Sequence, residues 1–373
     1  MNIGFEAKRI FHNRTGLGNY SRDLVRILSQ YFPENKYFLY NPIPTNKNLF
    51  KTNNSSVFEK KPNSNFYSRF YNIWRQKGVV KDLVTDEIIL FHGLSGEIPR
   101  GLTKTKIKSI VTVHDLIFMR LPQFYSFWDR VIYFYKFRKS TREANLVVAI
   151  SEQTKIDLIK YFNVPSDKIK VIYQGCNPAF KKDYSTKQKE TVIEKYNLPD
   201  NFILNVGTVE CRKNVLSAVK AIKDIDISLV IIGNQTPYKK KVEDYIVENN
   251  IEHKILFLND VDVEELAIIY QLATLFIYPS LYEGFGIPII ESLYSKTPVI
   301  TTKGGVFPEA AGPNSLFIEP FDVQDLSDKI ALVLQDSLHA SKMKKEGWQF
   351  VQQFNDEVIA KNIMNCYQKV LST

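Results

Sequence analysis

The chain has 373 residues, which is too long for one ordinary hydrophobic core and predicts two domains of roughly 150–180 residues each. Hydrophobic residues make up 44% and charged residues 24%, a balance typical of a globular protein, which excludes a largely disordered or low-complexity chain. No stretch of about 18 apolar residues occurs, so we expect no membrane-spanning helix.

The N-terminal residues and the cysteines indicate the compartment. The opening sequence MNIGFEAKRIFHNRTG has no apolar region long enough for a signal peptide. Cys176, Cys211 and Cys366 lie far apart and are odd in number, so they predict neither a disulfide framework nor a CxxC site. We therefore expect a protein of the reducing cytoplasm.

The formal net charge of +9 is spread unevenly along the chain. Residues 1–175 contain 28 Lys and Arg against 14 Asp and Glu, a charge of +14, whereas the remainder has 21 against 26, a charge of −5. An anionic partner should therefore meet the N-terminal half. The alternative is a solvated, lysine-rich surface without a partner.

Short apolar runs alternate with helical patterns in the first half of the chain. The runs lie at residues 2–6, 37–40, 88–92, 107–114, 146–150 and 169–173. Helical patterns such as residues 19–30 and 152–162 lie between them. This alternation is typical of βαβ units and of a parallel sheet.

The second half repeats the alternation after a polar interval. Residues 176–199 contain Pro178, Pro199 and a lysine-rich run, which predicts a linker with a short lead-in helix. The strand-like segments NFILNVG, ISLVIIG, KILFLND, ATLFIYPS and TPVITT then follow, separated by helical patterns. We expect an α/β protein with one Rossmann-like domain over 1–175 and a second over 200–350. A C-terminal helix within 351–373 is expected to cross back to the first domain.

Ligands of such sheets bind at the carboxyl ends of the strands, so residues just after strands are the candidates for a site. The first motif is TGLGN, where Gly16 and Gly18 precede a helix and would let backbone N–H groups approach a phosphate. Ser21 replaces the third glycine of a GxGxxG pattern, which disfavours a dinucleotide-binding dehydrogenase. A plain tight turn explains this motif equally well.

The second motif is NVGTVECRKN, residues 205–214. A strand is expected to end at Gly207, and Arg212 and Lys213 follow at the mouth of the next helix. Two cations at that place would clamp a diphosphate through charge-assisted hydrogen bonds. A solvated basic pair is the alternative.

The third motif is SLYEGFGIPIIESLYSKTPVI, residues 280–300. Glu283 stands in a glycine-rich loop, and Pro288 suits the first turn of a helix in which Glu291 lies one turn further on. Because Glu291 is surrounded by apolar residues it should be partly buried, and a buried carboxylate needs a partner such as ligand hydroxyls. The N–H groups of Gly284, Phe285, Gly286 and Ile287 would add an anion site.

These strings together resemble family 4 glycosyltransferases, which have the GT-B fold. EGFGIPIIE is similar to their E-x7-E motif, and TVECRKN, the Gly-x-Gly loop, VTVHDLIF, AISEQTK and VIYQG resemble the same family in the same order, over nearly the whole chain. RTGLGNYSRDL, HDL and FHGLS look most like mannosyltransferases of bacterial surface-polysaccharide synthesis. The resemblance implies two Rossmann-like domains that face each other across a cleft, an N-terminal acceptor domain and a C-terminal nucleotide-sugar domain.

The resemblance also implies residue roles. Glu283 would contact donor-sugar hydroxyls near the reacting carbon, Glu291 the ribose hydroxyls, and Arg212 and Lys213 the diphosphate. His114, at a strand end and followed by Asp115, would lie beside the donor sugar, although a lone histidine there is often structural. Gly16, Gly18 and Gly207, with residues 284–287, complete the implied donor site.

No metal site is expected. Asp224-Ile225-Asp226 precedes a strand, at the wrong end for the site, and Asp260-Val261-Asp262 stands at a helix start, where an acidic N-cap is the better explanation. The five histidines form no ligand-spaced pair. Positive groups would instead stabilise the departing nucleoside diphosphate.

Aromatic and basic residues are interleaved in two N-terminal segments, 66–81 and 118–142. This composition suits an interfacial helix on anionic lipid, with core packing as the alternative for many of the rings. The residues expected on a membrane or acceptor face are Arg69, Trp74, Arg75, Trp128, Lys136 and Lys139. No nucleic-acid-binding motif accompanies them, so nucleic acid is not expected as a partner.

The sequence thus predicts a metal-independent hexosyltransferase with no cofactor besides its nucleotide-sugar substrate, and the family resemblance implies that it retains the anomeric configuration. By resemblance the donor is GDP-mannose, a GDP-sugar rather than a UDP-sugar, and the acceptor is a glycan or lipid-linked sugar. The expected location is the cytoplasm, at the inner face of the cytoplasmic membrane. The alternatives are a GT-B nucleotide-sugar epimerase and a non-catalytic protein that binds membranes or nucleic acid.

Overall fold

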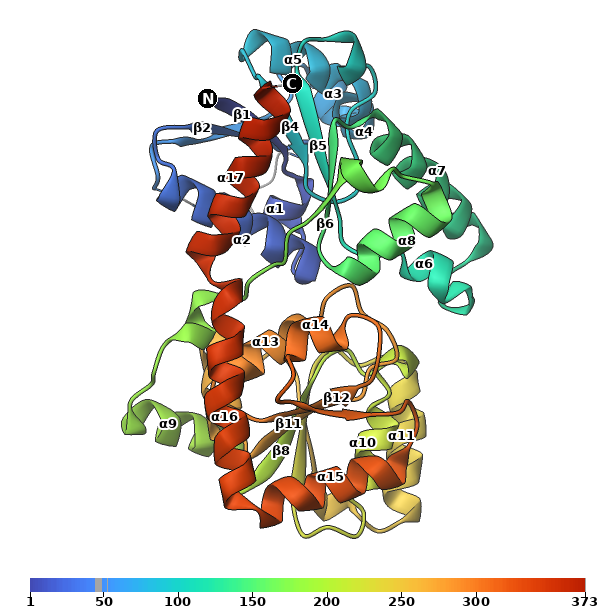
Figure 1. Cartoon of the computed structure of the whole chain (residues 1–373), viewed down its shortest axis with the longest axis vertical. Helices are drawn as coiled ribbons and strands as arrows, with labels where there is room; N and C mark the ends of the chain where they lie inside the picture. Colours follow the sequence, from blue (N-terminus) through green and yellow to red (C-terminus); the bar gives the residue numbers. More distant parts are fainter. Residues whose placement is uncertain (44–48, 52, 373) are drawn as a thin grey trace. The chain divides into compact units, whose positions relative to one another are not determined.

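The computed structural model describes residues 1–43, 49–51 and 53–372 and divides the chain into two compact units. Unit 1 comprises Met1–Gly175 and Phe354–Thr373, and unit 2 comprises Cys176–Gln353. Each unit contains one parallel β-sheet with helices packed against it (Figure 1). The expected α/β class with two Rossmann-like sheets is therefore confirmed.

The sheet of unit 1 has seven strands in the order β3-β2-β1-β4-β5-β6-β7, and every pair is parallel. The strands are β1 (Asn2–Glu6), β2 (Lys36–Tyr40), β3 (Val57–Lys60), β4 (Leu90–Gly93), β5 (Lys108–Val113), β6 (Leu146–Ala149) and β7 (Ile169–Val171). The chain winds outward from β1 in one direction and from β4 in the other, so the two strands flank the topological switch point. The sequence predicted six of these strands but not β3, an edge strand without buried residues.

The helices of unit 1 are α1 (Lys8–His12), α2 (Gly16–Tyr31), α3 (Asn65–Arg69), α4 (Tyr71–Ile73), α5 (Val79–Thr85), α6 (Ile117–Arg120), α7 (Phe127–Glu143), α8 (Glu152–Phe162) and α17 (Asp356–Ser372). A turn of π-helix, η1 (Trp74–Gly78), connects α4 to α5. Short 3-10 helices occur at η2 (Leu102–Lys104), η3 (Pro122–Phe124) and η4 (Ser166–Lys168).

Side chains that alternate along the strands form a separate core on each face of this sheet. Ile110 and Val148 point to one face, which α1, α2 and α17 cover. Val111 and Val147 point to the other, which α5, α7 and α8 cover. Both faces are buried, which is why these strands read as continuous apolar runs.

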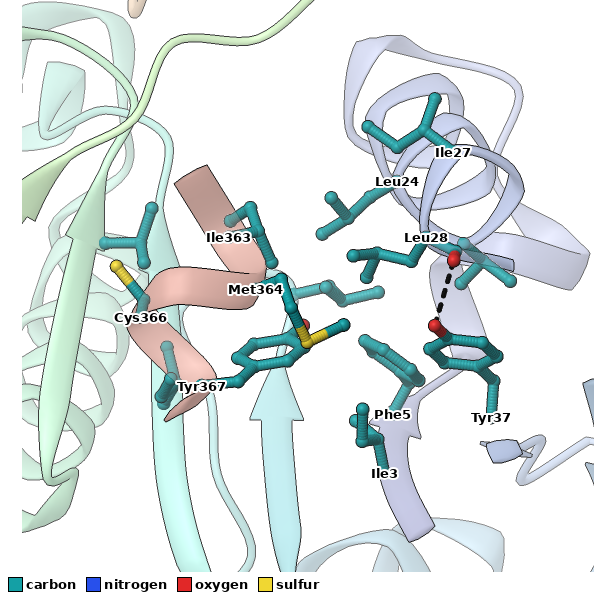
Figure 2. Packing of buried hydrophobic residues seen from close by; sticks show 14 of the residues in the cluster. Ile3, Phe5, Leu24, Ile27, Leu28, Tyr37, Ile363, Met364, Cys366 and Tyr367 are labelled. Atoms are coloured by element: carbon teal, nitrogen blue, oxygen red, sulfur yellow. Dashed lines mark hydrogen bonds between the residues drawn. The ribbon is translucent and has the colours of Figure 1, made fainter. Parts of the chain in front are cut away.

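The C-terminal helix α17 belongs to unit 1, although its sequence follows unit 2. Its Ile363, Met364 and Tyr367 pack against the side of the sheet that carries Phe5 and α2 (Figure 2). The Tyr367 hydroxyl lies 2.7 Å from Nδ1 of the buried His92. The apolar packing and this hydrogen bond together hold the C-terminal helix α17 on the sheet of unit 1.

The sheet of unit 2 has six parallel strands in the order β10-β9-β8-β11-β12-β13. The strands are β8 (Phe202–Val206), β9 (Ser228–Ile232), β10 (Ile255–Leu258), β11 (Leu275–Tyr278), β12 (Val299–Thr302) and β13 (Leu316–Ile318).

The α-helices of unit 2 are α9 (Thr186–Tyr196), α10 (Val215–Ala221), α11 (Tyr238–Glu248), α12 (Val263–Leu272), α13 (Ile287–Tyr294), α14 (Phe307–Ala311), α15 (Val323–Gln335) and α16 (Ser337–Val351). The 3-10 helices are η5 (Pro178–Lys181), η6 (Cys211–Lys213) and η7 (Glu252–Lys254), and η8 (Gln352–Phe354) follows α16. The switch point of this sheet lies between β8 and β11.

Residues 176–199, which the composition indicated as a linker, lie within unit 2. Ser185 begins α9 with a capping box, and α9 packs beside α12. Glu265 of α12 accepts hydrogen bonds from Lys195 and from the Tyr196 hydroxyl, each at 2.6 Å. A polar, lysine-rich composition therefore describes a solvated helix here rather than a free connection.

Replacing Ile363 with alanine should lower the free energy of unfolding of unit 1 by about 2–5 kcal/mol, because it opens a cavity in a closely packed core. The neighbouring Asn362 is exposed, so Asn362→Ala is a matched control and should change stability by less than about 0.5 kcal/mol. Urea unfolding followed by circular dichroism measures both. Equal stability of the two variants would show that α17 does not complete this core.

Candidate active site

The switch point of unit 2 carries the second and third sequence motifs. β8 ends before Gly207, whose φ of 152° lies outside the range that side chains prefer. The chain then turns through η6, which presents Arg212 and Lys213. Because β11 is the neighbour of β8, the loop after β11 brings Glu283 to the same edge of the sheet.

Arg212, Lys213 and Glu283 are in direct contact. Lys213 Nζ lies 2.7 Å and Arg212 NH1 lies 2.9 Å from Glu283 Oε1. Ser280 Oγ donates to the same oxygen, and Lys213 Nζ also donates to the Tyr278 hydroxyl at 2.6 Å. The structure thus joins three of the predicted site residues into one cluster. It adds Tyr278 and Ser280, which the sequence offered only as part of an apolar strand and its end.

The cluster is charge-balanced. Arg212 forms a second ion pair with Glu210 at 2.6 Å, so two cations meet two carboxylates. Burial alone would raise the pKa of Glu283, but Lys213 and Arg212 overcome that effect and hold it at about 2. Glu283 is therefore ionised at any physiological pH and keeps both cations pointed at the edge of the sheet.

Residues 284–287 form the turn into α13. Gly286 is the N-cap residue with φ of 103°, a conformation that favours glycine, and Pro288 stands in the first turn. Phe285 is buried beneath the turn. The sequence prediction of a helix start in this loop is therefore confirmed.

Glu291 lies one turn into α13. The Tyr270 hydroxyl donates to its Oε2 at 3.2 Å. Withdrawal from water raises the pKa of Glu291 to about 7, and the bond from Tyr270 opposes that rise only in part. Glu291 thus differs from Glu283, eight residues earlier, because no cation accompanies it among its described contacts.

Gly16 and Gly18 of the TGLGN motif lie in the first turn of α2, so this helix begins earlier than the sequence predicted. A Cβ on Gly18 would come within 2.0 Å of the Asn13 carbonyl oxygen, so close backbone packing explains this glycine. The N–H of Gly18 already donates to the Thr15 carbonyl and to Asn13 Oδ1. A Cβ on Gly16 would meet nothing within 4 Å, which leaves the space before the helix open at that residue.

His114 follows β5 and is 9% exposed. Its Nε2 lies 2.8 Å from the Leu94 carbonyl oxygen, which can only accept, so Nε2 carries the proton. The ring packs edge-on against Tyr20, and burial lowers the pKa of His114 to about 4. A neutral imidazole in a fixed tautomer results, held at the carboxyl end of the sheet.

The structure separates the residues that were expected on a membrane or acceptor face. Two of these side chains do not lie on an exposed membrane face. Trp74 is 1% exposed and donates to Asp82 at 2.6 Å, and Arg75 is largely buried and pairs with Glu6 and Glu97. Helical spacing of aromatics did not distinguish core from surface. Arg69 is exposed, Trp128 is 73% exposed, Lys136 is partly exposed and pairs with Glu97, and Lys139 pairs with Glu143.

No group of three or more His, Cys, Asp and Glu side chains suited to a metal ion occurs among the residues that the structure describes. Asp262 caps α12 and accepts from the Glu264 N–H at 3.0 Å, as its position in the sequence predicted. Asp224 and Asp226 precede β9, at the opposite end of the sheet from the cluster around Glu283.

Comparison with known proteins assigns the class. Sucrose-phosphate synthase from Thermosynechococcus elongatus has the same fold, with a TM-score of 0.80 and 20% identity over 100% of this chain and 99% of that one. Two doubly wound sheets of this kind are the GT-B fold. A glycosyltransferase family 4 model matches residues 52–180, and a model for glycosyl transferases group 1 matches residues 187–350. The chain belongs to family 4 of the glycosyltransferases.

Two relatives are similar to this chain. O-antigen chain mannosyltransferase B of Escherichia coli is 28% identical over 99% of this chain and 100% of that protein. O-antigen chain mannosyltransferase RfbU of Salmonella typhimurium is 32% identical over 60% of each chain. In the described part of the chain, no helix has the length and apolar character needed to cross a membrane.

Glu283→Gln should destabilise unit 2 by about 2–4 kcal/mol at pH 7, because it leaves two largely buried cations without their shared carboxylate. Glu210→Gln is the matched control: its carboxylate is 34% exposed, against 11% for Glu283, and should contribute about 1 kcal/mol or less. Urea midpoints measured on both variants test this. Losses of equal size would contradict a special role of Glu283 in holding the cluster.

Proposed function

We propose that this glycosyltransferase transfers mannose from GDP-mannose, with retention of configuration, to a glycan or lipid-linked acceptor in polysaccharide or O-antigen-type synthesis. The observation that carries the donor assignment is the contact of Arg212, Lys213 and Glu283 at the switch point of unit 2. Mannose is supported by the two similar O-antigen mannosyltransferases. Unit 2 is the donor domain in this proposal and unit 1 the acceptor domain.

In the proposed reaction the departing diphosphate is stabilised by positive charge. Arg212 and Lys213 are already desolvated and oriented by Glu283, so they need little rearrangement when the phosphate oxygens replace part of their carboxylate contacts. The N–H groups of Gly286 and Ile287, where α13 begins, add dipoles for the same anion. Gly18 serves the fold of its loop, because its N–H is already bonded.

In this proposal two different glutamates contact the donor sugar and the ribose, Glu283 with a lowered pKa and Glu291 with a raised pKa. Glu283, always ionised, accepts hydrogen bonds from donor-sugar hydroxyls, and neutral His114 lies beside the sugar. Glu291 accepts the ribose hydroxyls. No metal is assigned, because two cationic side chains supply the positive charge that a metal would bring.

The decisive experiment is a transfer assay preceded by a thermal-shift screen of nucleotide sugars. GDP-mannose should raise the melting temperature and give a mannosylated product with excess chelator present.

The double variant Arg212→Ala/Lys213→Ala should lower turnover by orders of magnitude and weaken GDP binding, whereas Lys344→Ala/Lys345→Ala, on exposed residues of the same unit, should change neither. Near-normal transfer by the first variant would contradict the clamp. Loss of activity with chelator, restored by manganese, would contradict metal independence. Epimerised donor without transfer would favour the epimerase.

The affinity for GDP-mannose should depend on the ionisation of Glu291. Ribose hydroxyls bind the ionised carboxylate better, and the free protein holds the pKa of Glu291 at about 7. Affinity should therefore fall as the pH drops from about 8 to 6, over a range in which the diphosphate diester of GDP-mannose does not titrate. Glu291→Gln should bind weakly and without this slope. Calorimetry tests both, and a flat wild-type profile would contradict the ribose assignment.

The same pKa predicts a stability effect of known sign. The folded protein binds a proton at Glu291 more tightly than the unfolded chain does, so this contribution to stability is present below about pH 4.5 and is lost as the pH rises through about 7. Relative to wild type, Glu291→Gln should therefore become more stable over that range.

We also propose that unit 1 binds an anionic membrane surface through α7. Its exposed aromatic and aliphatic side chains are Phe124, just before the helix, and Phe127, Trp128, Ile132, Tyr133 and Tyr135. Arg130, Arg138 and Lys139 lie on the same helix, in the half of the chain with a charge of +14. Aromatic rings flanked by basic residues suit a lipid interface, at about 1 kcal/mol for each cation near the surface.

Sedimentation with vesicles tests this surface. Wild type should pellet with anionic vesicles, less so in high salt, and not with neutral ones. Arg138→Glu/Lys139→Glu should abolish pelleting, whereas Lys344→Glu/Lys345→Glu in unit 2 should not. A wild type that ignores anionic vesicles at low salt would contradict the proposal and favour an acceptor free in solution.

A further inference from the structure

A second charged network lies at the switch point of unit 1. β1 ends at Glu6, and Glu97 follows the end of its neighbour β4 by four residues. Ligands of open α/β sheets bind at the carboxyl edge beside the switch point. This edge of unit 1 therefore has the position of a binding site, distinct from the donor cluster in unit 2.

Arg75 joins the two carboxylates. Its Nε donates to Glu6 Oε1 at 2.8 Å and its NH1 lies 3.2 Å from Glu97 Oε2. Gln76 Nε2 donates to Glu97 Oε2 at 3.0 Å and Lys136 Nζ to Glu97 Oε1 at 3.2 Å. Both oxygens of Glu97 are thus bonded. The only contacts of Glu6 in the described ranges, from Arg75 and from the Lys8 N–H at 3.2 Å, meet at Oε1.

The other oxygen of Glu6 has no donor. Glu6 is 6% exposed, and its Oε2 is buried without a hydrogen-bond partner anywhere in the described residues. A buried carboxylate oxygen without a donor is unfavourable because it has lost its hydrogen bonds to water, and few native structures retain one without a reason. A ligand with a hydrogen-bond donor would satisfy this oxygen.

The segment that delivers Arg75 is irregular in the way that functional segments often are. α3 and α4 are separated by Phe70, and the π-helical turn η1 follows at once. Such turns are rare and frequently occur at functional sites. The buried Trp74 anchors the turn through Asp82, and the Tyr71 ring lies 5.5 Å from Lys8 Nζ. The turn therefore holds Arg75 rigidly over the end of β1.

We propose that Glu6 Oε2 accepts a hydrogen bond from a hydroxyl of the acceptor sugar, with Arg75 as the residue that orients the carboxylate. This inference rests on the proposed function, in which the acceptor is a glycan. The carboxylates of Glu6 and Glu97 would repel an anionic ligand group at this edge. The positive charges of Lys8 and Arg75 would repel a ligand ammonium group. A neutral polyol, whose hydroxyl groups donate hydrogen bonds, suits the unpartnered oxygen of Glu6.

The test is binding of methyl glycosides of mannose, glucose, galactose and N-acetylglucosamine to the full chain, measured by saturation-transfer NMR. At least one should bind, and Glu6→Gln should weaken it tenfold or more: with its oxygen held by Arg75, the glutamine presents an N–H₂ donor where the carboxylate accepts. The matched control is Asp86→Asn, which removes another largely buried carboxylate paired with a lysine, Lys60. It should bind as wild type does.

Deoxy analogues of the bound glycoside distinguish a direct hydrogen bond to Glu6 from an indirect structural effect of the substitution. Their affinities are measured first on the wild type. One analogue should lose about as much affinity as Glu6→Gln, and the variant should not discriminate against it. Binding to no glycoside, equal binding by wild type and Glu6→Gln, or preference for an amino sugar would each overturn the proposal. GDP-mannose binding, measured in parallel, should be unchanged in both variants. Its absence in the wild type would count against the proposed function, whereas its presence with no glycoside effect would count against Glu6 alone.

Discussion

The donor-side geometry depends on one carboxylate oxygen, Glu283 Oε1, which contacts both Lys213 and Arg212. The cations and the carboxylate are 70 residues apart in the chain and meet because β8 and β11 are neighbours in the sheet. Without Glu283 the two cations would repel each other at the end of a loop. With it, they are held close and partly desolvated, which is the state in which positive charge stabilises a leaving group most strongly.

The sequence predicted this region well for a physical reason. Parallel strands buried on both faces are continuous apolar runs, and polar residues that directly follow such runs must lie at one edge of the sheet. Arg212, Lys213 and Glu283 follow two such runs, and the structure brings all three together at one edge of the sheet. The sequence did not predict Tyr278, whose hydroxyl accepts from Lys213, because a tyrosine inside an apolar strand looks like any other core residue.

The sequence was misleading where one pattern fits both a buried and an exposed position. Aromatics at helical spacing in residues 66–74 suggested a surface stripe, yet Phe66 is 56% exposed and Trp74 is 1% exposed. The interruption at Phe70 and the π-helical turn break the spacing, so one periodicity cannot describe both ends. Likewise part of the N-terminal positive charge is neutralised internally, since Arg75 and Lys136 contact Glu97. The charge of +14 already subtracts Glu97, so this pairing leaves the net charge unchanged, but it removes Arg75 and Lys136 as separate contacts for an anionic surface.

The two units place the same kind of group at the same topological position. In each sheet a glutamate stands at the switch point, and cations bind it through Oε1: Arg212 and Lys213 for Glu283, Arg75 for Glu6. A cation on one oxygen fixes the plane of a carboxylate, so the group meets a ligand as an oriented acceptor. Sugars are recognised through hydroxyls that need such acceptors. A transferase has two sugars to hold, and each doubly wound sheet offers one switch point. In the proposed function, Glu283 accepts hydrogen bonds from the donor sugar and Glu6 from the acceptor sugar, so each sheet supplies one oriented carboxylate.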